Sequence, residues 1–304
     1  VAGAGAREAD VVIEAIFENV DAKRALYAQL EAAMKPGALL ATNTSSIMIE
    51  TLAERLTDPQ RLVGIHFFNP VAQMQLIEVV RGAQTRPEVE TAALAFVRKL
   101  DKLPLPCRSA PGFVVNRILM PYINEALFAL QEGIPAAVID QTSVRFGMPM
   151  GPIELADVVG LDVCLSVGKV LTQAFGRAAP DSVERLVQAK TLGRKTGQGL
   201  YRWENGKPVR AAAENTPTPP DLEDRLILVM LNEAVAILRE KIVADHDLLD
   251  AGVIFATGFA PFRGGPMQYA KTRGIAAVRS RLQELERLHG ARFRPDVGWD
   301  NLTE

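Results

Sequence analysis

The chain has 304 residues, of which 48% are hydrophobic and 23% charged, a balance typical of a folded globular protein of more than one domain. Its formal net charge of -2 provides no overall field to attract nucleic acid or an anionic membrane, and no apolar run approaches the roughly 18 residues needed to span a bilayer. Two cysteines and three histidines exclude a disulfide framework and a cysteine-based zinc site, so we expect no metal.

The first hundred residues alternate between short apolar runs and amphipathic stretches. The apolar runs predict strands over residues 10–16, 38–42, 62–66, 74–80 and 103–107. The amphipathic stretches predict helices over residues 20–34, 49–56 and 87–100. Alternation at this spacing predicts a mostly parallel, doubly wound sheet.

The pattern changes near residues 109–111, after which almost everything is predicted to be helical. These helices cover residues 113–131, 136–146, 152–159 and 162–175, and helices resume at Asp221. A polar, proline-rich stretch at residues 204–220 predicts an extended linker. An α/β part is therefore expected to precede an all-α part that a linker divides.

Two segments of the helical part resemble each other. Asn124-Glu125-Ala126 recurs 108 residues later as Asn232-Glu233-Ala234. Gly151-Pro152 recurs, in the same order along the chain, as Gly265-Pro266. We interpret this recurrence as a duplicated helical domain.

A parallel sheet of this kind often carries a phosphate-binding glycine loop directly after its first strand. Gly3 and Gly5 precede the first predicted strand, and Glu8 stands where a small residue is expected, so we do not interpret them as that loop. No other stretch fits the pattern. Either no dinucleotide binds, or the loop lies upstream of Val1.

The densest group of polar residues runs from Asn43 to Glu78. Ser45 follows a predicted strand, His66 ends the next one, and Glu78 lies within an apolar strand, where a carboxylate is costly unless it is paired. A histidine is a natural partner, because the carboxylate fixes its tautomer and raises its basicity. The spacing equally allows a purely structural ion pair, with Ser45 capping the following helix.

Other candidate residues are weaker. Cys107 and Cys164 have apolar neighbours and are interpreted as packing residues. His246 and His289 are expected at helix ends, and Lys195 is either a solvated turn residue or a ligand for an anion.

Six motifs in order give the chain a specific resemblance. They are N-T-S-S, H-F-F-N-P, L-I-E-V-V, P-G-F-V-V-N-R, P-M-G-P-I-E-L-A-D-V-V-G-L-D and G-R-K-T-G-Q-G-L-Y. From Asp10 to about Arg273 the sequence resembles the L-3-hydroxyacyl-CoA dehydrogenase family, in particular the dehydrogenase portion of the multifunctional fatty acid β-oxidation α-subunit. The family's glycine loop and ribose-binding acidic residue would precede Asp10 and are absent.

The resemblance implies roles for individual residues. The implied catalytic residues are His66, Glu78, Ser45 and Asn116. The implied NAD contacts are Glu18, Lys23, Ser45, Asn69 and Lys195. In the second repeat Asp224 replaces Asn116, so this copy is expected to be structural.

The fold implied is an incomplete NAD-binding Rossmann domain over residues 1–109, followed by helical C-terminal domains over residues 110–212 and 213–304. The activity implied is oxidation of L-3-hydroxyacyl-CoA to 3-ketoacyl-CoA with NAD, within a longer multifunctional enzyme that also carries an enoyl-CoA hydratase domain. The implied partners are the acyl-CoA substrate and a thiolase subunit. A bacterial cytoplasm is the expected location, with the mitochondrial matrix or peroxisome as alternatives. The alternative function is a catalytically incompetent scaffold or acyl-CoA-binding module.

Overall fold

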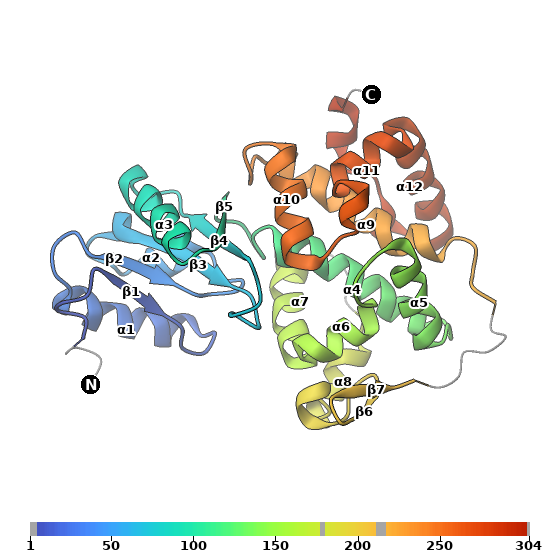
Figure 1. The fold of residues 1–304 in the computed structure, drawn as a ribbon, viewed down its shortest axis with the longest axis horizontal. Coiled ribbons are helices and arrows are strands. Elements are labelled where there is room, and N and C mark those ends of the chain that lie inside the picture. Colours follow the sequence, from blue (N-terminus) through green and yellow to red (C-terminus); the bar gives the residue numbers. More distant parts are fainter. Residues whose placement is uncertain (1–4, 177–179, 211–216, 303–304) are drawn as a thin grey trace. The chain divides into compact units, whose positions relative to one another are not determined.

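The computed structural model describes residues 5–176, 180–210 and 217–302 (Figure 1). The chain divides into two compact units. The first unit comprises the described part of residues 1–114 together with residues 241–248. The second comprises the described parts of residues 115–240 and 249–304. No helix in the described ranges is both long and apolar enough to cross a membrane.

The first unit is built on a five-stranded sheet. Its strands are β1 (Val11–Glu14), β2 (Leu39–Thr42), β3 (Leu62–Phe67), β4 (Leu76–Arg81) and β5 (Leu103–Arg108). They lie side by side in chain order, and three of the four pairings are parallel. The β3–β4 pairing is antiparallel. The predicted mostly parallel sheet is therefore confirmed, with one reversal that matters for the site.

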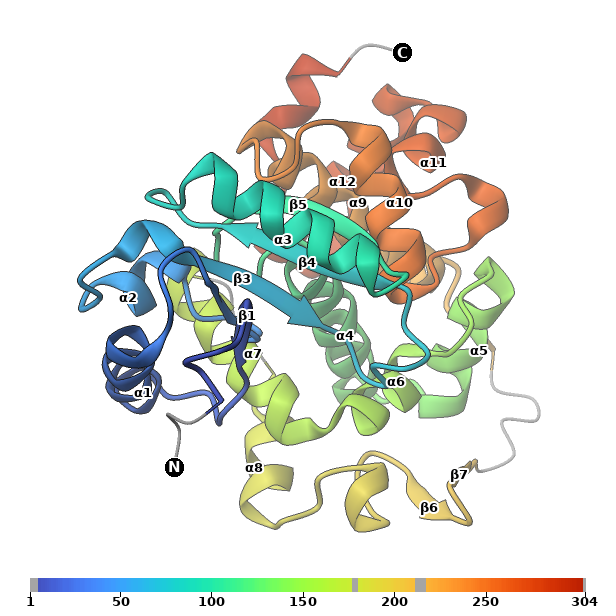
Figure 2. The same ribbon diagram turned by 60° about the vertical axis from the view of Figure 1, so that its left-hand side comes forward.

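Helices cover the sheet and complete the core of this unit. They are α1 (Val20–Ala33), α2 (Ile49–Ala53), the short 3-10 helix η1 (Pro59–Arg61) and α3 (Pro87–Lys99). Helix α3 lies across strands β3 to β5 (Figure 2). Alternate residues of the strands, such as Val63, Ile65 and Val79, pack with Ala93 and Val97 of this helix. Because the strands are buried, they appear in the sequence as nearly continuous apolar runs.

The remaining chain is mainly helical. Its α-helices are α4 (Val115–Gln131), α5 (Ala136–Phe146), α6 (Pro152–Val159), α7 (Leu161–Phe175), α8 (Ser182–Gln188), α9 (Leu222–Arg239), α10 (His246–Thr257), α11 (Pro266–Arg273) and α12 (Ile275–His289). Its 3-10 helices are η2 (Arg194–Thr196), η3 (Pro261–Arg263), η4 (Ala291–Phe293) and η5 (Val297–Asn301). Helices α4 and α9, the longest of the two repeats, pack against each other (Figure 1).

The contact between α4 and α9 is reciprocal. Arg117 Nε donates to Glu233 Oε1 at 2.6 Å, and Arg225 Nε donates to Glu125 Oε1 at 2.7 Å. All four side chains are at most 2% exposed. Arg117 and Glu125 each lie 108 positions before their counterparts Arg225 and Glu233, so the two bonds are related as in a twofold-symmetric contact. This arrangement agrees with duplication of one helical unit.

The repeated Gly-Pro step also has a structural cause. Asp140 accepts hydrogen bonds from backbone N–H groups that open α6, and Asp250 does the same at α11. A Cβ at Gly151 would lie 2.3 Å from Asp140 Cα, and one at Gly265 would lie 2.5 Å from Asp250 Cβ. Glycine thus allows the close approach, and proline suits the first helical position because its missing N–H is not needed there.

Two expectations require correction. The long helix predicted from residue 113 begins at Val115, because Phe113 has a left-handed φ of 51° after Gly112 with φ 71°. The stretch predicted as an extended linker from residue 204 instead includes a hairpin of β6 (Arg202–Glu204) and β7 (Lys207–Val209).

That hairpin has a visible sequence signal. Asn205 and Gly206 have φ values of 50° and 75°, as expected for a two-residue Asn-Gly turn. The polar composition of the stretch obscured this signal. Residues 211–216 of the predicted linker lie outside the described residues.

Candidate active site

His66 and Glu78 face each other across neighbouring strands. The antiparallel register of β3 and β4 makes them direct partners, and His66 Nδ1 lies 2.7 Å from Glu78 Oε2. His66 is 4% exposed and Glu78 is 0% exposed. Because an ionised carboxylate can only accept, Nδ1–H is the donor in this bond, and Nε2 is the ring nitrogen that does not face Glu78.

Aromatic rings and a backbone hydrogen bond surround this pair. The rings of Phe68 and Phe113 meet the imidazole of His66 edge to face, with centroid distances of 4.6 and 5.8 Å. The backbone N–H of Val114 donates to Glu78 Oε1 at 2.9 Å. Both carboxylate oxygens therefore have hydrogen-bond partners inside the first unit, which compensates the cost of burying the charge.

Ser45 stands in a loop that Glu18 holds in place. The loop follows β2, and Glu18 Oε1 accepts hydrogen bonds from Thr44 Oγ1 at 2.6 Å and from the backbone N–H groups of Ser45 and Ser46 at 2.9 and 3.2 Å. No side-chain cap was found at the following helix, α2, whose N-cap is Met48. Ser45 is therefore not the N-cap residue of that helix.

Lys23 is buried at 1% exposure and belongs to a network that the sequence did not reveal. Its Nζ lies 2.8 Å from Glu14 Oε1 and 3.5 Å from Glu18 Oε2. Glu14 Oε2 also accepts from the hydroxyls of Tyr27 and Thr42. Burial opposes ionisation of Glu14, but the bonds from Lys23 and Tyr27 outweigh it and hold its pKa below the ordinary value.

Glu14 is a functional candidate that the sequence reasoning missed. Its signal was a carboxylate at the end of the apolar run D-V-V-I-E, the same kind of signal that identified Glu78. Through Lys23, Glu14 links the end of β1 to Glu18 and so to the Ser45 loop.

The described residues fit one end of a dinucleotide. The carboxyl ends of the parallel strands β1, β2 and β3 carry the Glu18 and Ser45 loops and His66, and ligands of such sheets bind at this edge. The described loop from β1 to α1 contains no glycine, since Gly5 precedes β1 and Asn19 caps α1. The residues described at this edge thus form a polar site without a glycine-rich pyrophosphate cradle after β1.

The predicted site residues fall on both units. Asn69 is exposed directly after β3 in the first unit. Asn116 lies in the first turn of α4, and Lys195 lies in η2, both in the second unit. Lys195 Nζ is 2.5 Å from Asp162 Oδ1 and is 46% exposed.

The weaker candidates have structural explanations. Burial raises the pKa of the Cys107 thiol well above its ordinary value and that of Cys164 to about 12, so neither is an activated nucleophile. His246 begins α10 beside Asp247, and His289 Nε2 at the end of α12 lies 2.7 Å from Asp221. Within the described ranges, no group of three or more His, Cys, Asp or Glu side chains could hold a metal ion.

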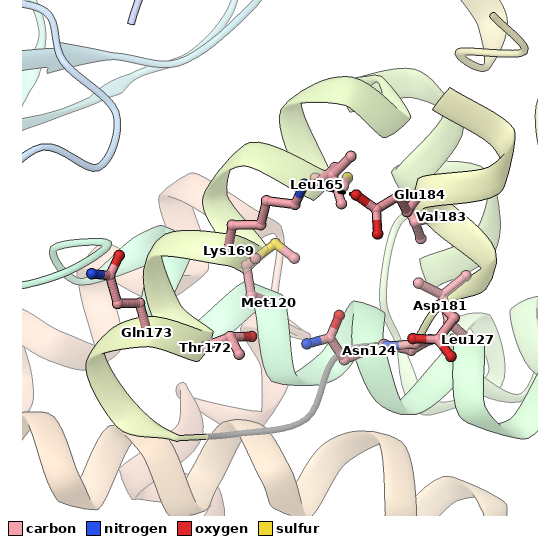
Figure 3. Close-up of a pocket in the computed structure, with 13 residues that line it drawn as sticks. Met120, Asn124, Leu127, Leu165, Lys169, Thr172, Gln173, Asp181, Val183 and Glu184 are labelled. Atoms are coloured by element: carbon pink, nitrogen blue, oxygen red, sulfur yellow. Dashed lines mark hydrogen bonds and ion pairs between the residues drawn. The ribbon is translucent and has the colours of Figure 1, made fainter. Parts of the chain in front are cut away.

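The second unit also contains a pocket of about 310 Å³ between α4, α7 and α8 (Figure 3). Met120 and Asn124 of α4 and Thr172 of α7 line it. None of the predicted site residues is among its lining residues.

Comparison with known proteins places the chain in a family. Residues 2–110 match the NAD binding domain of 3-hydroxyacyl-CoA dehydrogenase, and residues 112–203 match the C-terminal domain of the same enzyme family. The structure of (S)-3-hydroxybutyryl-CoA dehydrogenase from Ralstonia eutropha is 40% identical, covers 66% of this chain and 73% of its own, and has a TM-score of 0.63. The chain belongs to the 3-hydroxyacyl-CoA dehydrogenase family.

Other members of the 3-hydroxyacyl-CoA dehydrogenase family match over more of the chain. The 3-hydroxybutyryl-CoA dehydrogenase of Escherichia coli K12 is 27% identical, with a TM-score of 0.85 over 98% of this chain and 82% of that one. The fatty acid oxidation complex subunit alpha of Psychrobacter cryohalolentis is 39% identical over 88% of this chain and 40% of its own length. The chain thus spans about 40% of the length of the curated relatives that it matches.

Proposed function

We propose that the chain catalyses NAD-dependent oxidation of L-3-hydroxyacyl-CoA to 3-ketoacyl-CoA in fatty acid β-oxidation. The observation that carries this proposal is the buried pair of His66 and Glu78, with Nδ1 and Oε2 2.7 Å apart, at the positions of the family's motif. Membership of the 3-hydroxyacyl-CoA dehydrogenase family supports the substrate class and the cofactor.

In the proposed mechanism, His66 Nε2 removes the proton of the C3 hydroxyl. Glu78 stabilises the imidazolium that forms, because its carboxylate already accepts the Nδ1–H bond. Bound NAD would supply the acceptor for the hydride that leaves C3. A positioned general base contributes roughly 10²–10⁴-fold to the rate. Ser45 orients the substrate oxygen, and we propose Asn116 as a further catalytic residue, as the family's motif implies.

Four further residues would hold the cofactor. These proposed contacts, in addition to Ser45, are Glu18, Lys23, Asn69 and Lys195. The Glu14–Lys23–Glu18 network supports this assignment, since it fixes the loops at the carboxyl end of the parallel strands.

The larger context is also a proposal. The similarity to fatty acid oxidation complex alpha subunits, of whose length the chain spans about 40%, supports a place in a longer multifunctional enzyme. We propose that this enzyme also carries an enoyl-CoA hydratase domain, as the resemblance implies. We propose the acyl-CoA substrate and a thiolase subunit as partners, and a bacterial cytoplasm as the location.

The proposed activity is tested by replacing the base. His66→Gln keeps a polar side chain of similar length but removes the basic nitrogen, so turnover of acetoacetyl-CoA with saturating NADH should be abolished. His246→Gln, at an exposed histidine on α10, is the matched control and should keep wild-type turnover. Retention of more than about one tenth of wild-type kcat by His66→Gln would remove His66 from the role of base.

Measurements on the unsubstituted chain distinguish the proposed enzyme from the alternative function, a scaffold or acyl-CoA-binding module. The described residues lack a pyrophosphate cradle, so we expect NADH to bind weakly in a fluorescence titration. Turnover that rises with NADH concentration supports the enzyme. Acyl-CoA binding with no turnover at any NADH concentration supports the alternative.

A further inference from the structure

We infer that the turn at residues 112–114 is the positioning element of the His66–Glu78 pair, and that Phe113 and Val114 act on kcat without touching the substrate. This inference rests on the proposed function of the pair. It starts from Phe113, whose φ of 51° lies in the left-handed region. That region is unusual for a bulky residue, and such strain persists where the surrounding structure requires it.

A backbone hydrogen bond and burial of its side chains hold the turn in place. Phe113 N–H donates to the carbonyl of Ala110 at 3.0 Å, and both Phe113 and Val114 are fully buried. Gly112, with φ 71°, precedes them and supplies a second left-handed residue. The chain therefore turns sharply before α4 begins at Val115.

Two consecutive residues of this turn reach the two members of the pair. Phe113 places its ring 5.8 Å from the His66 imidazole at an interplanar angle of 62°. Val114 donates its backbone N–H to Glu78 Oε1 at 2.9 Å. A helical φ at Phe113 would redirect both groups, so the strained conformation lets one turn hold both side chains.

Each contact restrains a different motion. The Val114 bond fixes the rotation of the carboxylate, so that Oε2 faces His66 Nδ1. The rings of Phe113 and Phe68 restrict tilting of the imidazole. Displacement of a catalytic group by about 1 Å can cost on the order of 10²-fold in rate. Phe113 is thus a positioning residue for the base.

The kinetic test replaces the ring by an aliphatic side chain. Phe113→Leu should lower kcat by about tenfold to a hundredfold and leave KM for NADH and acetoacetyl-CoA within about twofold. The matched control is Phe146→Leu in the second unit, since Phe146 is also fully buried and meets two aromatic rings edge to face. The control should lower thermal stability and leave kcat unchanged.

A spectroscopic test does not depend on turnover. The chain has three histidines, so the imidazole resonances of His66 can be assigned by comparison with His66→Gln. Phe113→Leu should change the Nδ1 and Nε2 shifts of His66 and their pH titration, whereas Phe146→Leu should not. Equal kcat and equal His66 resonances in the two variants would overturn the inference.

The wild-type chain provides the remaining measurements. If Phe113→Leu does not fold, an NOE between the rings of Phe113 and His66, with a Val114 amide shift that moves in Glu78→Gln, supports the inference. Absence of that NOE overturns it. A wild-type chain without turnover would contradict the proposed function, while these NMR measurements would still decide the role of the turn.

Discussion

The two helical repeats share a scaffold but use one equivalent position differently. Both contribute a buried arginine to the α4–α9 contact, Arg117 in the first repeat and Arg225 in the second. The residue just before each arginine is Asn116 in the first and Asp224 in the second. Asp224 accepts hydrogen bonds from Arg273 at 2.5 Å and Arg281 at 2.7 Å. The second repeat thus uses this position for internal ion pairs, while the first keeps the asparagine of the family's motif.

A second difference lies in the chain that follows each repeat's last long helix. In the first repeat Asp157 accepts from the backbone N–H groups of Leu200 and Tyr201 and so holds the loop that carries Lys195. In the second repeat Asn232 of α9 accepts from the indole of the buried Trp299 and fixes the C-terminal segment. Each repeat thus binds a buried tryptophan indole, through Asp157 in the first and Asn232 in the second.

The largest expected effect tests what the repeats share. Arg117→Met should lower the free energy of unfolding by about 3–5 kcal/mol, because it removes the guanidinium that donates to the buried Glu233. Arg225→Met should have the smaller effect of the two, because Glu125 keeps its bond from Arg292. Trp203 and Trp299, the two tryptophans of the chain, both lie in the second unit, so tryptophan fluorescence during urea unfolding reports on it.

The matched control for this prediction removes both charges of one pair. The double variant with Arg117→Met and Glu233→Gln should recover part of the stability lost in Arg117→Met. If Arg117→Met lowers stability and Arg225→Met does not, the two ion pairs of the reciprocal contact are not energetically equivalent.

A smaller effect tests how the repeats differ. Burial opposes ionisation of Asp224, but the bonds from Arg273 and Arg281 outweigh it and lower its pKa. At a pH above about 3.9, the pKa of an aspartate in the unfolded chain, the lowered pKa contributes its full stabilisation. This stabilisation is lost as the pH falls through the pKa of Asp224 in the folded chain. Asp224→Asn should therefore cost roughly 1–3 kcal/mol at pH 7 and progressively less below about pH 4.

Urea unfolding at several pH values measures this difference. Asp247→Asn is the control, because the Asp247 side chain is 90% exposed and should change stability little at any pH. A cost of Asp224→Asn that stays constant from pH 7 to pH 3 would contradict an ionic role for Asp224.

The smallest effect concerns the loop that only the first repeat carries among the described residues. Lys195 and Asp162 are 46% and 40% exposed, so Lys195→Ala should change the free energy of unfolding by less than about 1 kcal/mol. If Lys195 is a cofactor contact as proposed, the same variant should weaken NADH binding. Lys207→Ala, on the exposed hairpin strand β7, should change neither. A large loss of stability in Lys195→Ala would identify a structural residue instead.

Local patterns in the sequence predicted most elements of the fold. The apolar runs identified all five strands of the first sheet, and helical periodicity identified α5 and α6 with their observed bounds. The hairpin at Asn205 and Gly206 could have been predicted from its turn residues. These features depend on neighbouring residues, so the sequence by itself determined them, together with the residue types available for the site.

Partners of buried charges were decided by the tertiary structure. The antiparallel β3–β4 register placed Glu78 opposite His66, and the pairing of Lys23 with Glu14 required α1 to pack beside β1. Nothing in the helical pattern of residues 113–131 indicated that Phe113 would leave the helix, because periodicity records which residues are apolar and not where the chain must turn. These pairings and this turn depend on which buried donors and acceptors the folded chain brings together. A buried charge is tolerated only where it has such a hydrogen-bond partner.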